Sequence, residues 1–548
     1  MRRALIAVQI VSVLAVLFCA YTILGRVAHG CELEWTTGAV FDHAERVASG
    51  QPIYIAPSID WIPLPFPPAY YAVVGPLMKV FPGFMAGRIV SILATLVQAV
   101  CVWRLASKHG ARRTWCIVAI GFFAGAFAYC GLWYDVERPD SLFVATIAVG
   151  ITILAERTGV FATAVAGAIV GAAFFVDQPA LWFTFGGIAA LGISRQWNRA
   201  AVFAIAAGAV LFIGLVGLQA KTGWFAYYVL RMPRLEASLA KHAFLDDAPT
   251  AFALVSGSAF FVARWLRQRA KPGTGDAVLA CAVCAGALAA IVSRAQRGGQ
   301  DNVLMPFTMF ACPAAAVAGA RLAALRARTW MGPLVPLAAA AQMVIWTYDP
   351  PGAIPQRSAV RFAQQFERKV KQLEQDGEVL VTGRGHVTSR RHAHMVAILD
   401  VLRAEGKVPD ELARPFRDRR FAAIVIDSFD DLELSYMPEL HGKLLTIVLA
   451  SYYVAERLDA EQPDARVGYR THPRWVLRPR RDPIEESDAE RVRCRAKTER
   501  AIAETAERAA REGVRPEPRP DVEKISAEAC RRAFSITPFP PNAWVEEL

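Results

Sequence analysis

Eleven strongly apolar segments in the first 350 residues constrain this chain more than any other feature. They cover residues 5–26, 84–106, 114–134, 141–156, 160–176, 180–194, 200–219, 249–266, 277–294, 303–325 and 331–348. A bilayer core about 30 Å thick needs about 20 apolar residues per helix, and helices inside a bundle can be shorter. The first segment follows Arg2 and Arg3 as in a signal peptide, but the same pattern then repeats, which favours an uncleaved span. The sequence therefore predicts a mainly α, polytopic transmembrane helix bundle of about eleven spans.

Charged residues divide the loops between these segments into two sets. If the N-terminus is cytoplasmic, every inner loop contains Arg or Lys, in agreement with the positive-inside rule; these loops are residues 107–113, 156–159, 195–199, 267–276 and 327–331. The opposite loops collect acidic residues: Glu32, Glu34, Asp42, Glu45, Asp60, Asp135, Glu137, Asp140, Asp177, Asp246, Asp247 and Asp301. Acidic residues do not set orientation, so their concentration on one face indicates a function there.

The first external loop, residues 27–83, contains a further apolar run at residues 69–80. This run is too short to cross a bilayer easily, and we interpret it as a juxtamembrane or re-entrant helix. Counting it as a crossing would reverse all later loops and place the Arg-rich ones outside the cell.

The composition changes at Asp349-Pro350-Pro351-Gly352, a breaker cluster that ends the predicted membrane domain of residues 1–350. Residues 351–481 then predict a small α/β domain, with elements at residues 378–382, 391–404, 421–426 and 443–455. We expect this domain to be extracytoplasmic, because an odd number of spans precedes it. Residues 482–548 are rich in Glu, Arg and Ala and predict a charged, partly helical tail.

The net charge of +12 does not indicate a nucleic-acid partner, because basic loops are expected from membrane topology alone. The chain has no P-loop, G-x-S-x-G or dinucleotide motif, so nothing supports ATP- or NAD-dependent chemistry. His386, His392 and His394 lack a Cys or carboxylate at a recognisable spacing, so no metal site is predicted. A divalent cation stays open, as does a pairing of Cys494 with Cys530.

Two acids, Glu32 and Glu34, directly follow the first span. A carboxylate at the membrane surface can serve as a general base, although an ordinary hydrated loop acid is the simpler reading of either one alone. Their context adds information, because three further motifs follow: Asp42-His-Ala-Glu-Arg46, Gly50-Gln-Pro-Ile-Tyr54 and Pro65-Phe-Pro-Pro-Ala-Tyr70-Tyr71. This layout resembles the GT-C glycosyltransferase superfamily, polytopic enzymes that include protein O-mannosyltransferases and the lipid A aminoarabinose transferase. The resemblance implies that Glu34 is the catalytic loop acid, with Glu32 as its rival, and draws Tyr70 into the substrate site.

A second group, Asp135-Val-Glu137-Arg138-Pro139-Asp140, lies between the third and fourth spans on the same predicted face. The planar guanidinium of Arg138 is suited to bidentate bonds with a phosphate, and we predict that Asp135 and Glu137 also bind substrate. Asp140 precedes an apolar run, so a helix cap is an equally good explanation of it. The resemblance favours function, because GT-C enzymes carry a second external acid at this point of the topology.

Two further turns belong to the same predicted face. Asp177 and Gln178 interrupt an apolar stretch, where a carboxylate usually faces a wet cavity. A second turn follows the ninth span, and its predicted substrate-binding residues are Arg294, Arg297, Asp301 and Asn302. These arginines are suited to a phosphate, although interfacial arginines that anchor to lipid head groups explain them as well.

The leading hypothesis from the sequence is an inverting sugar transfer at the outer face of a bacterial inner membrane. The donor is a sugar linked to a polyprenyl phosphate, and the acceptor is an envelope glycan, lipid or protein. Glu34 takes the acceptor proton, the arginines stabilise the leaving phosphate, and Asp140 and Asp177 orient the acceptor or hold the arginines. The alternatives are a transporter or flippase for lipid-linked saccharides, and a membrane anchor with an external binding domain.

Overall fold

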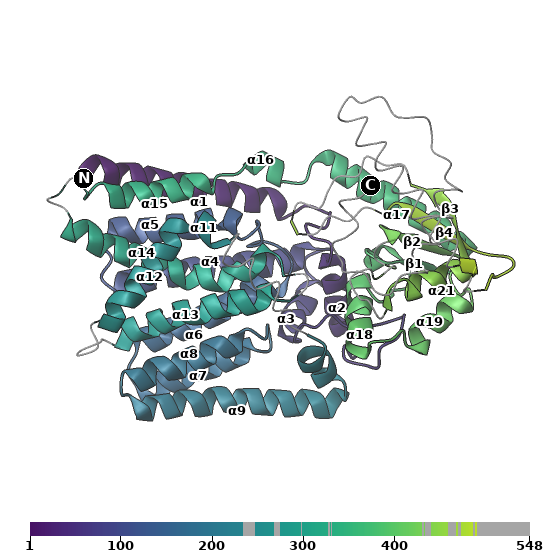
Figure 1. The fold of residues 1–548 in the computed structure, drawn as a ribbon, viewed down its shortest axis with the longest axis horizontal. Helices are drawn as coiled ribbons and strands as arrows, with labels where there is room; N and C mark the ends of the chain where they lie inside the picture. Colours follow the sequence, from purple (N-terminus) through teal and green to yellow (C-terminus); the bar gives the residue numbers. More distant parts are fainter. Residues whose placement is uncertain are drawn as a thin grey trace, which may run out of the picture. The chain divides into compact units, whose positions relative to one another are not determined.

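The computed structural model describes residues 1–489 of the chain apart from short gaps. These gaps are residues 234–246, 268–273, 297–298, 327–328, 330, 430–431, 433, 435–439, 459–466, 469–472 and 486–487. The described residues form two compact units (Figure 1). The first comprises the described residues of Met1–Ile55, Pro63–Ala363 and Pro463–Arg470, and the second comprises the described residues of Ala56–Ile62, Gln364–Gln462 and Thr471–Leu548. Most of the predicted tail, with Cys494 and Cys530, lies outside the described residues.

Each of the eleven predicted apolar segments forms a helix in the first unit. These helices are α1 (Arg2–Arg26), α4 (Met85–Lys108), α5 (Arg113–Tyr129), α6 (Pro139–Glu156), α7 (Val160–Ala173), α8 (Ala180–Ile193), α9 (Trp197–Thr222), α12 (Phe252–Arg267), α13 (Thr274–Arg294), α14 (Met305–Leu325) and α15 (Leu334–Ile345). Among the described residues, six helices are long and apolar enough to cross a membrane: α1, α4, α6, α9, α13 and α14. Four more, α5, α7, α8 and α15, are apolar but shorter. The prediction of a polytopic helix bundle is confirmed, while the number of crossings stays a prediction.

Burial separates the centre of the bundle from its edge. In α14, 83% of the most apolar window is buried, and this helix packs against α4, α5, α6, α12 and α13. In α9 the corresponding share is 11%, so its apolar side chains form a surface suited to lipid rather than to a protein core. Figure 1 shows α9 beside α7, with which it makes its closest packing.

The first loop contains two helices, α2 (Thr37–Ala48) and α3 (Ala69–Leu77), which pack against each other. The nine residues of α3 are too few to cross a bilayer, as the interpretation of this run as a non-crossing helix requires. Short elements complete the first unit: η1 (Tyr227–Arg231), α11 (Ala248–Thr250), η3 (Asp301–Leu304) and α16 (Pro350–Ala353).

The described part of the second unit contains a four-stranded mixed sheet in the order β1-β2-β4-β3. The strands are β1 (Val379–Val381), β2 (Ala423–Ile426), β3 (Tyr452–Arg457) and β4 (Trp475–Pro479). The parallel strands β1 and β2 are joined through α18 (Met395–Glu405) and α19 (Asp410–Arg417), and β4 runs antiparallel to both β2 and β3. The remaining elements are η4 (Glu374–Asp376), η5 (Gly385–Val387) and α21 (Lys443–Ser451), and α17 (Arg357–Leu373) begins in the first unit.

Two details of this unit differ from the sequence-based expectation. The apolar segment 443–455 is not one element, because it forms α21 and then continues directly into β3. The segment 56–62, which the sequence places in the first external loop, folds with the α/β residues of the second unit. The predicted boundaries 1–350, 351–481 and 482–548 stay predictions.

Candidate active site

Three segments that are far apart in the sequence meet around Arg138 in the first unit. Its Nη1 atom lies 3.2 Å from Glu34 Oε2, and its Nε atom lies 3.2 Å from Asp140 Oδ2. Asn302 then donates from Nδ2 to Asp140 Oδ1 at 2.5 Å. Together with Thr36 these residues form what we call the Arg138 cluster. It joins the loop after α1, the start of α6 and the turn η3.

The loops predicted to lie on the inner side meet separately. Arg104 pairs with Glu156, and Asp276 lies 3.7 Å from both Arg321 and His109. The two sets of loops therefore occupy two different ends of the helix bundle, as the charge pattern predicts. Which end faces the cytoplasm stays a prediction.

Glu34 is buried at the centre of the cluster, with 1% of its surface exposed. Its Oε2 atom accepts hydrogen bonds from the Thr36 backbone N–H at 2.9 Å and from the Thr36 hydroxyl at 2.6 Å. Burial raises the pKa of Glu34 above its ordinary value, although Arg138 and Thr36 act in the opposite direction. A carboxylate with a raised pKa is a stronger proton acceptor than an ordinary one.

Polar and aromatic partners hold Arg138 through its Nε and Nη1 atoms and the faces of its guanidinium group. It occupies the N-cap position of α6, where Pro139 provides the first helical residue. Its guanidinium carbon lies 5.1 Å from the centre of the Phe66 ring and 5.0 Å from the Trp133 ring, and Nη1 also bonds the Thr36 hydroxyl. Two aromatic faces and three polar partners thus fix the guanidinium in one orientation.

Asp140 lies in the first turn of α6, but it is not the helix cap, because that position belongs to Arg138. Its two carboxylate oxygens instead connect Arg138 to Asn302. The helix-cap explanation of Asp140 is therefore wrong.

Asp177 and Gln178 support the cluster from the turn between α7 and α8. Gln178 Nε2 donates to the Pro65 carbonyl at 2.6 Å, next to the Phe66 ring that contacts Arg138. Burial and the nearby charge of Asp140 raise the pKa of Asp177 to about 7. Asp177 can therefore exchange a proton near neutral pH.

Asp135 and Glu137 are engaged in buried ion pairs with helix arginines. Asp135 lies 3.1 Å from Arg26 Nη1, and Glu137 makes two bonds of 2.9 and 3.1 Å with Arg88. We predicted substrate binding for both acids, but this geometry favours a role in fixing the loop before α6. Tyr70 is also fully buried, and its hydroxyl lies 3.4 Å from the Gly87 carbonyl.

Arg294 forms a second centre next to the Arg138 cluster. It makes two bonds with Asp247, at 2.8 and 3.1 Å, and one of 2.8 Å with Asp301. Asp301 precedes Asn302 in η3, so this centre is connected by one residue to Asp140. Arg297 lies outside the described residues. Glu32 is half-buried, and the ion pair with Arg138 is made by Glu34.

Several neighbours of Arg138 and Glu34 were not predicted as site residues. Thr36 and Trp133 are ordinary loop residues in the sequence, and Phe66 lies in the Pro65–Tyr71 motif without a predicted role of its own. Gly468 is a further example, because a Cβ atom there would lie 3.1 Å from Glu34 Cγ, and its φ of +70° favours glycine. No local pattern connects residue 468 to residue 34.

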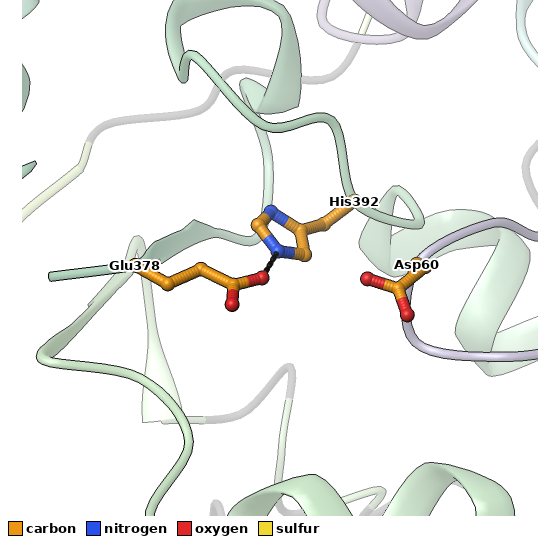
Figure 2. Close-up of side chains that lie close together, drawn as sticks. All are labelled: Asp60, Glu378 and His392. Carbon is orange, nitrogen blue, oxygen red and sulfur yellow. Dashed lines mark hydrogen bonds and ion pairs between the residues drawn. The ribbon is translucent and has the colours of Figure 1, made fainter.

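One group of side chains in the second unit has the composition of a metal site. The ligand atoms of Asp60, Glu378 and His392 lie within 4.8 Å of one another (Figure 2). The carboxylates were missed in the sequence because residues 60 and 378 follow no metal-binding spacing with residue 392. However, Arg420 Nη2 lies 2.5 Å from Asp60 Oδ1 and 2.7 Å from Glu378 Oε1. The guanidinium thus occupies the position that a cation would need.

Solved structures provide the comparison that decides the fold. ArnT from Cupriavidus metallidurans bound to undecaprenyl phosphate matches with a TM-score of 0.51 and 12% identity, over 85% of this chain and 97% of that chain. The apo state of the same protein matches with a TM-score of 0.51 and 13% identity, over 84% and 97% of the two chains. This chain has the fold of ArnT. The polytopic helix-bundle fold that the resemblance implies is therefore confirmed. No protein-family model and no curated protein sequence matches the chain.

Proposed function

We propose that this ArnT-like protein transfers a sugar from a polyprenyl-phosphate-linked donor to an acceptor at the outer face of the membrane. The observation that carries the proposal is the pairing of a buried acid, Glu34, with a rigidly held arginine, Arg138, where several interhelical loops meet. The fold supports the donor class, because ArnT is a structural neighbour that binds undecaprenyl phosphate.

The residues of the cluster fit the steps of an inverting transfer. Glu34 accepts the proton of the acceptor hydroxyl, whose oxygen attacks the anomeric carbon while the bond to the donor phosphate breaks. The phosphate leaves with the electron pair and gains negative charge, which Arg138 stabilises. Among the described residues, Nη2 of Arg138 takes no part in the bonds to Glu34, Thr36 and Asp140, so its N–H groups are available to a phosphate oxygen.

The raised pKa of Glu34 suits this role. A general base works best when its pKa approaches the working pH, and burial moves Glu34 in that direction. Asp140 and Asn302 fix the far side of Arg138, so they position the phosphate-binding group rather than react themselves.

The experiment uses purified full-length protein in nanodiscs with undecaprenyl phosphate carrying a radiolabelled hexose or pentose, and isolated envelope material as acceptor. Release of undecaprenyl phosphate reports transfer for any acceptor. We expect Glu34→Gln to reduce the transfer rate by about 10² to 10⁴-fold. Asp140→Asn should reduce it less, because Asp140 acts through Arg138.

The control is Glu367→Gln, which removes an exposed acid paired with Lys371 on the surface of α17 and should leave transfer unchanged. Wild-type protein that binds the donor without turning it over would overturn the proposal and indicate transport. Full activity in both Glu34→Gln and Asp140→Asn would remove the proposed mechanism.

A further inference from the structure

Part of the first loop is built into the α/β unit. The segment Ala56–Ile62, which we call the strap, leaves the first unit after Ile55 and returns to it at Pro63. Two backbone bonds of 3.2 and 3.1 Å between Ser58 and Trp61 close a tight turn. Ile59, Trp61 and Ile62 are buried, while Asp60 stands at the tip.

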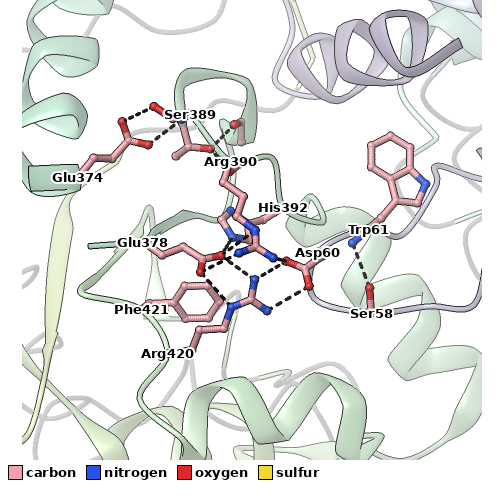
Figure 3. Close-up of polar contacts among 12 residues, drawn as sticks. Ser58, Asp60, Trp61, Glu374, Glu378, Ser389, Arg390, His392, Arg420 and Phe421 are labelled. Carbon is pink, nitrogen blue, oxygen red and sulfur yellow. Dashed lines mark hydrogen bonds and ion pairs between the residues drawn. The ribbon is translucent and has the colours of Figure 1, made fainter. Parts of the chain in front are cut away.

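The strap is held among residues of the second unit by a backbone bond and by an ion-pair network (Figure 3). The Ala393 N–H donates to the Ile59 carbonyl at 2.8 Å. Asp60 binds Arg420 through both of its carboxylate oxygens, at 2.5 and 3.1 Å. Arg420 in turn makes bonds of 2.7 and 3.1 Å with Glu378, whose Oε1 atom lies 2.7 Å from His392 Nε2.

The position of this network follows from the sheet. Glu378 immediately precedes β1, and Arg420 lies just before β2. Because β1 and β2 are parallel, their amino ends lie at the same edge and bring these two side chains together. The strap is thus fastened to the most regular part of the second unit.

Ion pairs with arginine explain the grouping of Asp60, Glu378 and His392 better than a bound cation does. Arg420 contacts both carboxylates, and Arg390 adds a second positive charge 3.4 Å from Asp60 and Glu378. Two guanidinium groups already balance the two acids, so a divalent ion would be uncompensated. Bidentate arginine bonds instead give a directed and specific fastening.

The residues that flank the strap support Arg138 in the first unit. The Tyr54 hydroxyl donates to the Phe66 carbonyl at 2.8 Å, which ties the segment before the strap to the segment after it. The Phe66 ring contacts Arg138, and Gln178 holds Pro65. The strap therefore connects two segments that hold Arg138 in place: the segment that ends with Tyr54 and the segment that contains Pro65 and Phe66.

We propose that Asp60 and Arg420 are positioning residues for sugar transfer. By fixing the strap they hold Tyr54 and Phe66 in place, so that Phe66 keeps the guanidinium of Arg138 oriented for the donor phosphate. This inference rests on the proposed function and adds that residues of the α/β unit assist the transfer by fixing the strap.

The test combines hydrogen exchange with kinetics on full-length protein in nanodiscs. Asp60→Asn and Arg420→Ala should each raise amide exchange in peptides that cover residues 53–68 by about tenfold or more. In the transfer assay both variants should lower kcat about tenfold with a smaller change in KM for the donor, because the phosphate-stabilising group is misplaced in the transition state. Arg420→Lys keeps the charge and should restore part of both signals.

The matched control is Arg417→Ala, which removes an exposed arginine of the same unit that pairs with Asp410 and should change neither signal. Unchanged exchange in both Asp60→Asn and Arg420→Ala would overturn the inference whatever the activity. Raised exchange with wild-type kinetics would also overturn it, while the proposed function would stand. A wild-type protein that transfers no sugar would refute the proposed function and with it the positioning role, although exchange would still report whether the strap is fastened.

Discussion

Burial and hydrogen bonding shift the pKa of Glu34 in opposite directions. Burial raises the pKa of the carboxyl, whereas Arg138 and both bonds from Thr36 lower it. The acid limb of the pH-rate profile should therefore lie above the ordinary glutamate range, and activity should fall as the pH drops through it.

Thr36→Val tests this balance, because it removes one hydrogen bond to the charged form of Glu34. A bond worth about 0.5 to 1.5 kcal/mol corresponds to a shift of roughly half to one pH unit. We expect the acid limb to move upward by that amount, measured as transfer rate against pH. Thr146→Val, which removes a hydroxyl bonded to the Leu142 carbonyl within α6, is the control. A downward or absent shift would contradict the assigned role of Thr36.

The raised pKa of Asp177 should make the stability of the folded protein depend on pH. The pKa of Asp177 is raised from 3.8 to about 7, so the unfolded chain releases this proton at a lower pH than the folded protein does, and the folded protein loses stability as the pH rises toward 7. Asp177→Asn removes this penalty and keeps the oxygen that accepts from the Gln178 N–H. The variant should gain about 2 kcal/mol relative to wild type between pH 5 and pH 8. Melting temperatures at the two pH values measure it, and an equal difference at both would refute it.

The sequence predicts the polar members of the site better than their surroundings. Glu34, Arg138, Asp140 and Asn302 were all predicted, because the polar side chains of the loops gather on one predicted face of the bundle and acidic residues do not themselves set orientation. Phe66 and Trp133 could not be predicted, since aromatic residues are common at membrane interfaces. The buried pairing of Asp135 and Glu137 depends on arginines in other helices, and no spacing reveals such partners.

At the scale of elements, Arg88 fastens α4 to the first loop. It bonds the carbonyls of Arg26, His29 and Cys31 at 2.5 to 2.9 Å and pairs with Glu137. Removing one partner of a buried ion pair typically costs about 3 to 5 kcal/mol, because the other charge stays buried without compensation.

Arg88→Ala should therefore lower the melting temperature strongly and reduce the yield of monodisperse protein in detergent. Arg104→Ala is the control on the same helix, because Arg104 is 52% exposed and pairs with Glu156 at the surface. Exposed pairs contribute about 0 to 1 kcal/mol. Similar losses of melting temperature in the two variants would show that burial does not determine how much the ion pair of Arg88 and Glu137 contributes to stability.

The contact between α7 and α9 depends on glycine. A Cβ atom at Gly167 would lie 2.5 Å from the Phe203 carbonyl oxygen, and one at Gly171 would lie 2.7 Å from that of Ala207. This G-x-x-x-G spacing lets two helix backbones approach closely. Gly171→Leu should separate the helices and lower the melting temperature, whereas Gly208→Leu on α9, where nothing lies within 4 Å, should not. Equal effects would mean that this close packing adds no stability.

Element types were predictable where apolar length decided them, and less so elsewhere. All eleven apolar segments became helices, since a lipid-facing chain must satisfy its backbone internally. The segment 443–455 was ambiguous because a short apolar run fits a helix or a strand equally well, and it forms both. The element expected at residues 391–404 is a helix that begins only at Met395, because the His394 side chain accepts a hydrogen bond from the Val396 N–H and caps it.

For the whole molecule, the fold is preserved in ArnT at 12% identity over 85% of this chain. Identity this low shows that the fold does not require most of the individual residues. The fold class could be predicted from this sequence because helix length and apolar pattern determine it. The sequence did not predict that the strap folds with the α/β unit, because this depends on the ion pair between Asp60 and Arg420, which are 360 residues apart in the chain.

The threading of the chain gives the last prediction. The loop between α4 and α5 belongs to the Arg-rich end of the bundle, and the loop between α5 and α6 carries Arg138. If α5 crosses the membrane, these two loops lie on opposite sides. Because positively charged loops are retained in the cytoplasm, the Arg138 cluster then faces outward, where lipid-linked sugar donors are used in the proposed reaction. A phosphatase that is active only outside should be active when fused after Gly131 and silent after Gly110, and a cytoplasm-dependent fluorescent reporter should show the reverse. If both fusions report the same side, α5 does not cross, and the Arg138 cluster cannot serve an acceptor at the outer face by this topology.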